Sequence, residues 1–441
     1  MPDRRLLALL GIAGLGVLVF WIGLLCTRHM VENVEIQLLG IVGWWQSGLF
    51  PYLHPTALPF LQNPYGPVYE GLVAHLPAPA EAPYLAGRLV SIAAFLATLG
   101  VVAWWVRQRG GSARLALLAA LLPLTAKPIV LFAPLYRVDS LGLLFAVSGF
   151  CLVTTRPTRA GVGFAAFAFW LAFNTKMTFL AAPLAALFFL WRSERRLALI
   201  LAALLGVLLP GSVLGLQYLS DGAYLATAAH GNLPSQPGKS LDMLARTLLS
   251  VFWLVAVVLA WRRKGAGGSA LSPALVYTVL SLAVAVAFAA NPLSSWNYLM
   301  EFYLALALWT GEVLAREPDA VGPRRACPAT WLLVHAALSL PIVAVLVVGA
   351  WREVQEYRPR FDAALQCLAP RVQAGERLIV LESLAGRDAL NALGVPSLVA
   401  APGVLETSPE VSGLLERALA MGEIDAVLRG DAATCGAGAG G

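Results

Sequence analysis

Eleven apolar runs recur along the chain, and their length constrains the fold more than any other feature. A helix needs about 20 mostly apolar residues to cross the hydrocarbon core of a bilayer, and most of the runs approach this length. We therefore expect an all-α polytopic membrane protein with about eleven transmembrane helices. The expected spans are residues 6–26, 85–106, 115–134, 141–154, 161–173, 177–191, 197–219, 247–261, 274–290, 298–314 and 331–350.

The composition supports this interpretation. Hydrophobic residues make up 59% of the chain and charged residues 13%, whereas soluble domains average about 25% charged residues. The mean hydropathy is +0.74, and a single water-soluble core could not bury that much apolar surface. The composition therefore excludes a soluble enzyme, a disordered protein and a fibrous protein.

The C-terminal tail differs from the rest of the chain. Residues 1–350 carry 23 Lys/Arg and 13 Asp/Glu, whereas residues 351–441 carry eight and twelve. The tail is thus acidic and has a charge density close to that of soluble domains. The segments "ERLIVLES" and "PSLVAA" are typical of strands, and residues 408–422 of a helix capped by Ser408. We expect a membrane body over residues 1–350 and a small soluble α/β domain over residues 351–441.

The positive charges indicate the orientation in the membrane. If the N-terminus is cytoplasmic, 16 Lys/Arg lie in cytoplasmic loops and seven on the opposite side before the tail, as the positive-inside rule requires. An odd number of spans then places the tail outside, where Cys367 and Cys435 could pair in an oxidising compartment. The cations are scattered over short loops, which argues against a nucleic-acid partner. No Cys/His spacing suits a metal, so we expect no metal site and no cofactor.

The first outer loop, residues 27–84, is too long to be a simple connection. Its segment 32–50 is predicted to form an amphipathic helix in the membrane interface, with Glu32 and Glu35 off the apolar stripe. Two carboxylates three residues apart on a helix are neighbours on one face. Either could act as a general base, or both could form a solvated polar edge.

Further charged residues stand at the outer ends of apolar runs. Arg137 and Asp139 close the second outer loop, where they could simply pair with each other or form part of a site, because an acidic residue at the mouth of a span is costly. Lys176 lies between two short apolar runs. Its ammonium could reach out to the interface or bind an anionic headgroup. Lys127 presents the same choice.

Several short motifs occur in a recognisable order. These are Glu35, "PY" at 51–52, "YGP" at 65–67, "GRLVS" at 87–91, "YRVDSLGLLFAVSG", "NTKMTFLAAPLA" and "NYLMEFYLALAL". In this order the chain resembles, over about residues 1–315, the bacterial GT-C superfamily of integral-membrane glycosyltransferases. The branch it resembles includes lipopolysaccharide glycosyltransferases and is distantly related to protein O-mannosyltransferases.

The resemblance implies an enzyme of the bacterial inner membrane that uses a polyprenyl-phosphate-linked sugar donor. It would transfer the sugar, with inversion, to an acceptor hydroxyl of a glycan, lipid or protein on the outer face. Glu35 matches the family's catalytic base, with Glu32 as the alternative, and Asp139 matches its second acidic position. The remaining assignments are Arg137, Lys176 and Lys127 for the donor phosphate, and His54, Tyr65, Asn297, Tyr298 and Glu301 for the acceptor or sugar pocket.

Two other functions remain open from the sequence. A transporter or flippase of a lipid-linked sugar would have charged residues near mid-bilayer or helices broken midway in matched halves. A non-catalytic membrane scaffold would not need Glu35, Arg137, Asp139 and Lys176 together. A transferase predicts instead that the carboxylates converge on one outward cavity.

Overall fold

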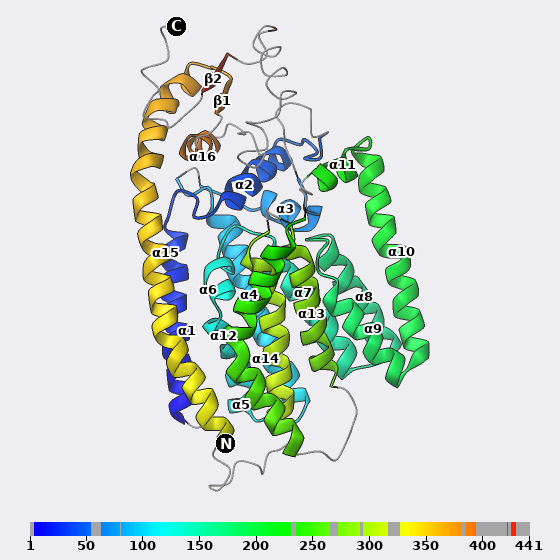
Figure 1. Ribbon diagram of the computed structural model, residues 1–441. Helices are drawn as coiled ribbons and strands as arrows, with labels where there is room; N and C mark the ends of the chain where they lie inside the picture. Colours follow the sequence, from blue (N-terminus) through cyan, green and yellow to red (C-terminus); the bar gives the residue numbers. More distant parts are fainter. Residues whose placement is uncertain are drawn as a thin grey trace.

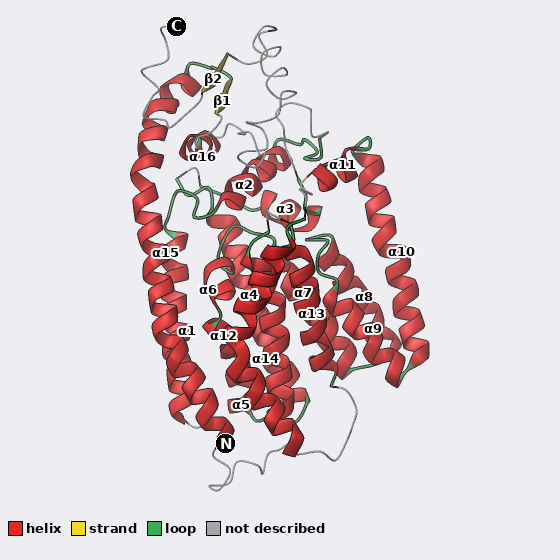
Figure 2. Ribbon diagram, viewed as in Figure 1, coloured by secondary structure: helices red, strands yellow, loops and turns green. Residues whose placement is uncertain are grey.

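The protein is a bundle of long helices with short helices and the tail gathered at one end (Figures 1 and 2). In this computed structural model the N-terminal helix α1 (Arg4–Leu25) runs beside the long helix α15 (Cys327–Gln373) along one edge of the bundle. The structure describes residues 4–53, 63–79, 81–230, 235–264, 272–291, 294–315, 327–380, 384–393, 421 and 425–428.

Each of the eleven expected spans coincides with a helix or with a group of short helices. The run 115–134 is divided into α5 (Ala113–Leu121), the 3₁₀ helix η1 (Leu122–Thr125) and α6 (Lys127–Phe132), since Pro123 and Pro128 interrupt a continuous helix there. The other helices of the bundle are α4 (Leu85–Gln108), α7 (Asp139–Thr155), α8 (Arg159–Phe173), α9 (Ala181–Ser193), α10 (Arg195–Leu219), α12 (Pro237–Lys264), α13 (Pro273–Ala289) and, after the 3₁₀ helix η2 (Trp296–Leu299), α14 (Met300–Ala315).

Four stretches in the described part of the chain are long and apolar enough to cross a membrane, and five apolar helices are shorter. The four are residues 6–25 of α1, α4, α10 and the stretch from Trp296 to Ala315. The expected number of eleven spans stays a prediction. Helix α7 lies inside the bundle against α4, α8 and α9, and most of its side chains are buried.

One end of the bundle carries α2 (Asn33–Gln46), α3 (Pro67–Ala74) and α11 (Ala223–His230), together with α16 (Leu384–Ala392) of the tail (Figure 1). Helix α2 is the helix expected within residues 32–50, and Leu38 and Ile41 of its apolar stripe are fully buried. Glu35 was expected off that stripe, yet it is buried too, because a buried arginine faces it. Glu32 stands at the N-cap with extended backbone rather than inside the helix.

The tail begins as a continuation of the bundle. Residue 351, the expected domain boundary, lies inside α15, which runs on to Gln373. Strands β1 (Leu378–Val380) and β2 (Ala426–Leu428) pair in parallel, and α16 lies between them in the sequence. Cys367 is disulfide-bonded. The expected helix over 408–422 and the strand "PSLVAA" lie outside the described residues, except Met421, so the division into two domains and the complete α/β domain stay predictions.

Candidate active site

Three segments of the bundle meet at the first residue of α7. Asp139 is buried, and its carboxylate accepts hydrogen bonds from Arg137 Nε at 2.9 Å, Lys176 Nζ at 2.8 Å and Asn297 Nδ2 at 2.7 Å. Lys176 comes from the turn between α8 and α9, and Asn297 from η2. Asp139 therefore holds together residues that are far apart in the sequence.

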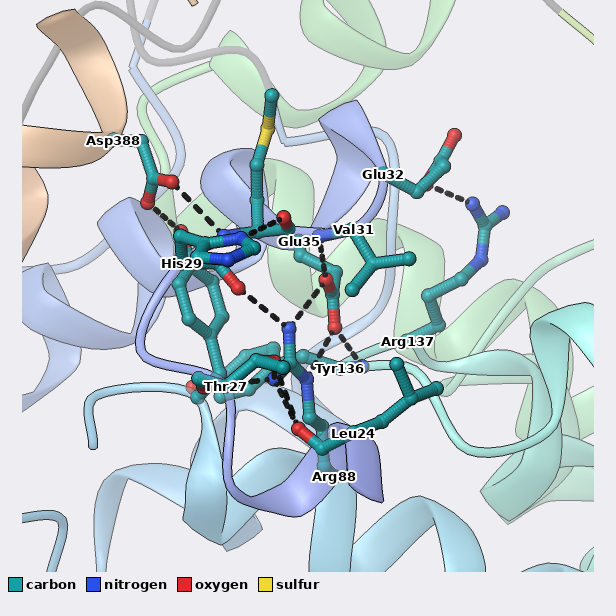
Figure 3. Close-up of polar contacts among 12 residues, drawn as sticks. Leu24, Thr27, His29, Val31, Glu32, Glu35, Arg88, Tyr136, Arg137 and Asp388 are labelled. Atoms are coloured by element: carbon teal, nitrogen blue, oxygen red, sulfur yellow. Dashed lines mark hydrogen bonds and ion pairs between the residues drawn. The ribbon is translucent and has the colours of Figure 1, made fainter. Parts of the chain in front are cut away.

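Arg137 extends this cluster to the first outer loop. Its Nη1 donates to Glu32 Oε2 at 2.5 Å (Figure 3), while the Glu32 carboxylate also accepts from the backbone N–H of Val34 and so caps α2. The Glu32 side chain is 29% exposed, whereas those of Arg137 and Asp139 are 4% and 3% exposed. Glu32 is thus the carboxylate of the cluster that solvent or a ligand can reach.

A small, partly open hollow lies beside these charges. Asp139, Lys176, Asn297, Tyr298 and Glu301 form its polar wall. The Lys176 ammonium lies 4.1 Å from the centre of the Tyr298 ring, a favourable cation–π arrangement. Apolar side chains complete the lining: Leu143 of α7, Phe179 of the turn before α9, Val284 and Ala285 of α13, and Met300 of α14. The hollow therefore joins a charged face to an apolar one.

Glu35 lies in a second, closed cluster (Figure 3). Both carboxylate oxygens face the Arg88 guanidinium, at 2.9 Å from Nε and 2.8 Å from Nη2. They also accept the backbone N–H groups of Val31 at 2.7 Å and Tyr136 at 2.8 Å. Burial raises the pKa of Glu35, but Arg88 and the two N–H donors outweigh it, so the pKa lies below its ordinary value. The geometry thus favours a structural carboxylate here.

The "YGP" and "GRLVS" motifs each contain a glycine at a point where the chain passes very close to another segment. A Cβ on Gly66 would lie 2.0 Å from the Asn174 carbonyl oxygen, and one on Gly87 would lie 2.2 Å from the Tyr136 ring. Since real Cβ contacts are never so short, only glycine lets the chain pass at these points. The first approach brings the first outer loop against the turn that carries Lys176, and the second seats the residue before Arg137.

The approach at Gly66 gives a testable prediction. Replacing Gly66 by alanine should destabilise the protein by about 1–3 kcal/mol, the usual cost of overpacking, and should lower its melting temperature. The matched control is Gly71→Ala inside the following helix α3, where an added Cβ meets nothing within 4 Å and helix propensity favours alanine. Thermal melts of the purified proteins check this, and equal melting temperatures would contradict the close approach.

The other predicted site residues lie at different distances from the cluster around Asp139. Tyr65 interacts with the charges of Arg137 and Asp139, and its pKa is raised, mainly by burial. Glu301 lines the hollow and accepts a hydrogen bond from Tyr277 at 2.9 Å. Lys127 is exposed, 6.0 Å from the Trp296 ring centre, and does not line the hollow. His54 lies outside the described residues.

The sequence reasoning missed Arg88 and Glu70. Arg88 is the ion-pair partner of Glu35, and its place inside the "GRLVS" motif was the available signal. Glu70 is fully buried in α3 and accepts from Asn63 at 2.7 Å and Trp45 at 3.4 Å. Burial raises its pKa to about 8, so Glu70 is mostly neutral at pH 7 and leaves the charge of the site to the other groups.

Comparison with solved structures identifies the architecture. The chain superposes with a TM-score of 0.60 and 16% identity on ArnT from Cupriavidus metallidurans in the apo state, covering 88% of this chain and 84% of that one. ArnT from the same organism bound to undecaprenyl phosphate gives the same TM-score and identity, covering 96% of this chain and 90% of that one. The chain has the GT-C fold. No family model and no curated protein matches the sequence.

The GT-C fold and the apolar helices make this an integral membrane protein. In the described residues no group of three or more His, Cys, Asp and Glu side chains could hold a metal ion. The candidate active site therefore consists of the cluster Glu32, Arg137, Asp139 and Lys176, together with the hollow beside it and the closed pair of Glu35 and Arg88 behind it.

Proposed function

We propose that this GT-C protein is an inverting glycosyltransferase that moves a sugar from a polyprenyl-phosphate donor to an acceptor hydroxyl on the outer face of the bacterial inner membrane. The observation that carries the proposal is the cluster of Arg137 and Lys176 around Asp139, at the outer end of this fold. A solved structure of the same fold, ArnT, has been determined with undecaprenyl phosphate bound.

The two cations suit a phosphate that becomes a leaving group. Contacts between described residues use the Nε and Nη1 donors of Arg137 and one donor of Lys176, so further N–H donors remain for phosphate oxygens. Charge-assisted hydrogen bonds from such groups are strong, and arginine can bind phosphate with two of them. Fixed positive charge also stabilises the negative charge that develops as the sugar–phosphate bond breaks.

Glu32 is the carboxylate best suited to act as the base. In the transfer, the acceptor oxygen forms a bond to the anomeric carbon, and the bond from that carbon to the phosphate oxygen breaks. The electron pair leaves with the phosphate, and the acceptor proton passes to Glu32. Glu35 has both oxygens occupied by four donors and is fully buried, so an acceptor cannot reach it.

The charge pattern supports an outward site. The loops on the same side as the N-terminus carry most of the cations, which favours a cytoplasmic N-terminus. Disulfide-bonded Cys367 favours an extracytoplasmic tail, because disulfides persist in oxidising compartments. Since nucleotide sugars are cytoplasmic, a site on this side needs a lipid-carried donor. The sugar and the acceptor (glycan, lipid or protein) are to be found by screening purified protein against polyprenyl-phosphate sugars.

Replacing Lys176 tests the proposal. Lys176→Met keeps the aliphatic stem but removes the charge, so kcat/KM for a polyprenyl-phosphate sugar should fall about 100-fold, and undecaprenyl phosphate should bind more weakly. Lys176→Arg should restore part of both. Lys127→Met, at an exposed lysine outside the hollow, should have a much smaller effect. Turnover and lipid binding within twofold of wild type for Lys176→Met would exclude a phosphate role for Lys176.

A further inference from the structure

The tail reaches the first outer loop through one buried aspartate. Helix α16 packs against α2, and Asp388 of α16 is fully buried. Its carboxylate accepts the backbone N–H of Met30 at 2.9 Å and the hydroxyls of Tyr84 and Tyr357, the latter at 3.3 Å. The donors come from the first outer loop, the start of α4 and the tail helix α15, so Asp388 joins the tail to the membrane body.

The loop that Asp388 holds is the one that presents Glu32. Arg88 Nη2 donates to the carbonyl of His29 at 3.0 Å, and Glu35 accepts the N–H of Val31 at 2.7 Å. Met30 stands between these two residues, so three consecutive residues of the loop are each fixed by a buried acidic or basic side chain (Figure 3). Glu32 follows directly and turns toward Arg137.

The three anchors differ in their origin. Arg88 and Glu35 belong to the membrane body, whereas Asp388 follows Arg88 by 300 residues and Glu35 by 353 residues in the sequence. The Arg88 guanidinium also stacks on the Tyr84 ring, 4.9 Å from its centre, and the Tyr84 hydroxyl donates to Asp388. The tail therefore contacts both the loop backbone and the residue packed on the Glu35 ion pair.

We propose that Asp388 is a positioning residue through which the tail fixes residues 29–32, so that the Glu32 carboxylate faces Arg137. Asp388 does not line the hollow and acts through the backbone of Met30. This inference rests on the proposed function of Glu32. It gives the tail a part in the transfer itself, because small displacements of a reacting group are costly for catalysis.

The test uses the full-length protein in detergent or nanodiscs. Asp388→Ala removes the three hydrogen bonds that the Asp388 carboxylate accepts, and it should lower kcat roughly 10- to 100-fold. The KM for the sugar donor should change less than twofold, because Arg137 and Lys176 keep their bonds to Asp139. Asp388→Asn retains an oxygen that can accept the Met30 N–H, so its loss should be smaller. The control Asp362→Ala, at an exposed aspartate of α15, should keep kcat within twofold.

A double-mutant cycle separates positioning from a general loss of folded protein. In a Glu32→Gln background, Asp388→Ala should lower kcat less than twofold further, because its effect passes through Glu32. If Asp388→Ala lowers kcat by the same factor in the wild-type and the Glu32→Gln backgrounds, the proposal is overturned. A kcat within twofold of wild type for Asp388→Ala would overturn it as well. If the alanine variant does not fold, the same cycle with Asp388→Asn decides.

Hydrogen exchange distinguishes this inference from the proposed function. Amides in residues 27–35 should exchange faster in Asp388→Ala than in wild type and in Asp362→Ala, whether or not the protein transfers a sugar. Faster exchange without any wild-type transferase activity would refute the proposed function but keep the link between tail and loop. Unchanged exchange in a protein with transferase activity would refute the link alone.

Discussion

Replacing Glu32 by glutamine is expected to lower kcat about 10²- to 10⁴-fold, the usual contribution of a general base. The amide keeps the size of the side chain but cannot take the proton of the acceptor hydroxyl. Donor binding should persist, because Arg137 and Lys176 remain bonded to Asp139 in the variant. Steady-state kinetics with a polyprenyl-phosphate sugar, and separate measurement of undecaprenyl phosphate binding, check this expectation.

Stability should change little in this variant. Glu32 is partly exposed, and Arg137 keeps its bond to Asp139, so no buried charge is left unpaired, while loss of the cap on α2 costs about 1 kcal/mol. The matched control is Glu81→Gln, an exposed glutamate of the same outer loop, which should keep kcat within twofold. Wild-type turnover in Glu32→Gln, together with loss of turnover in folded Glu35→Gln, would return the role of base to Glu35.

The sequence predicted the helices, and which motifs carry the clustered charged residues, better than it predicted which charged residues pair. Apolar run length located the helices, because a span must satisfy its backbone hydrogen bonds internally. The order of the motifs pointed to the GT-C fold, and Arg137, Asp139 and Lys176 do lie together. Asn297 joins the same cluster, 158 residues after Asp139. Composition and short motifs thus identified the elements and the residues, while the contact between Asn297 and Asp139 comes from the packing of the bundle.

The roles of Glu32 and Glu35 could not be separated in that way. Helical periodicity places residues three apart on one face, but Glu32 has φ −149° and ψ 145° at the N-cap and therefore lies outside the helix. The partner of Glu35 is 53 residues away, and nothing in the spacing of charges indicates which arginine pairs with it. The contact from Asp388 to Met30 spans 358 residues. Long-range pairing of this kind is decided by packing.

Replacing Glu35 by glutamine should therefore act mainly on folding. Arg88 would keep its charge while fully buried and would face a neutral amide, and breaking a buried ion pair costs about 3–5 kcal/mol. The amide –NH₂ group of the glutamine would also place a hydrogen-bond donor against the donors of Arg88 or against a backbone N–H. We expect a large fall in melting temperature and in the yield of monodisperse protein, measured by thermal melts and size-exclusion chromatography.

A compensating variant distinguishes a structural carboxylate from a catalytic one. Replacing both partners, as Glu35→Leu with Arg88→Met, removes the unpaired charge, and exchange of a buried ion pair for apolar side chains is often neutral. The double variant should therefore melt closer to wild type than Glu35→Gln does, and it should regain undecaprenyl phosphate binding. If Glu35→Gln instead melts like wild type but has no turnover, the ion pair contributes little to folding and Glu35 acts in the reaction. The same kinetic assay as for Glu32 then decides which of the two carboxylates accepts the proton.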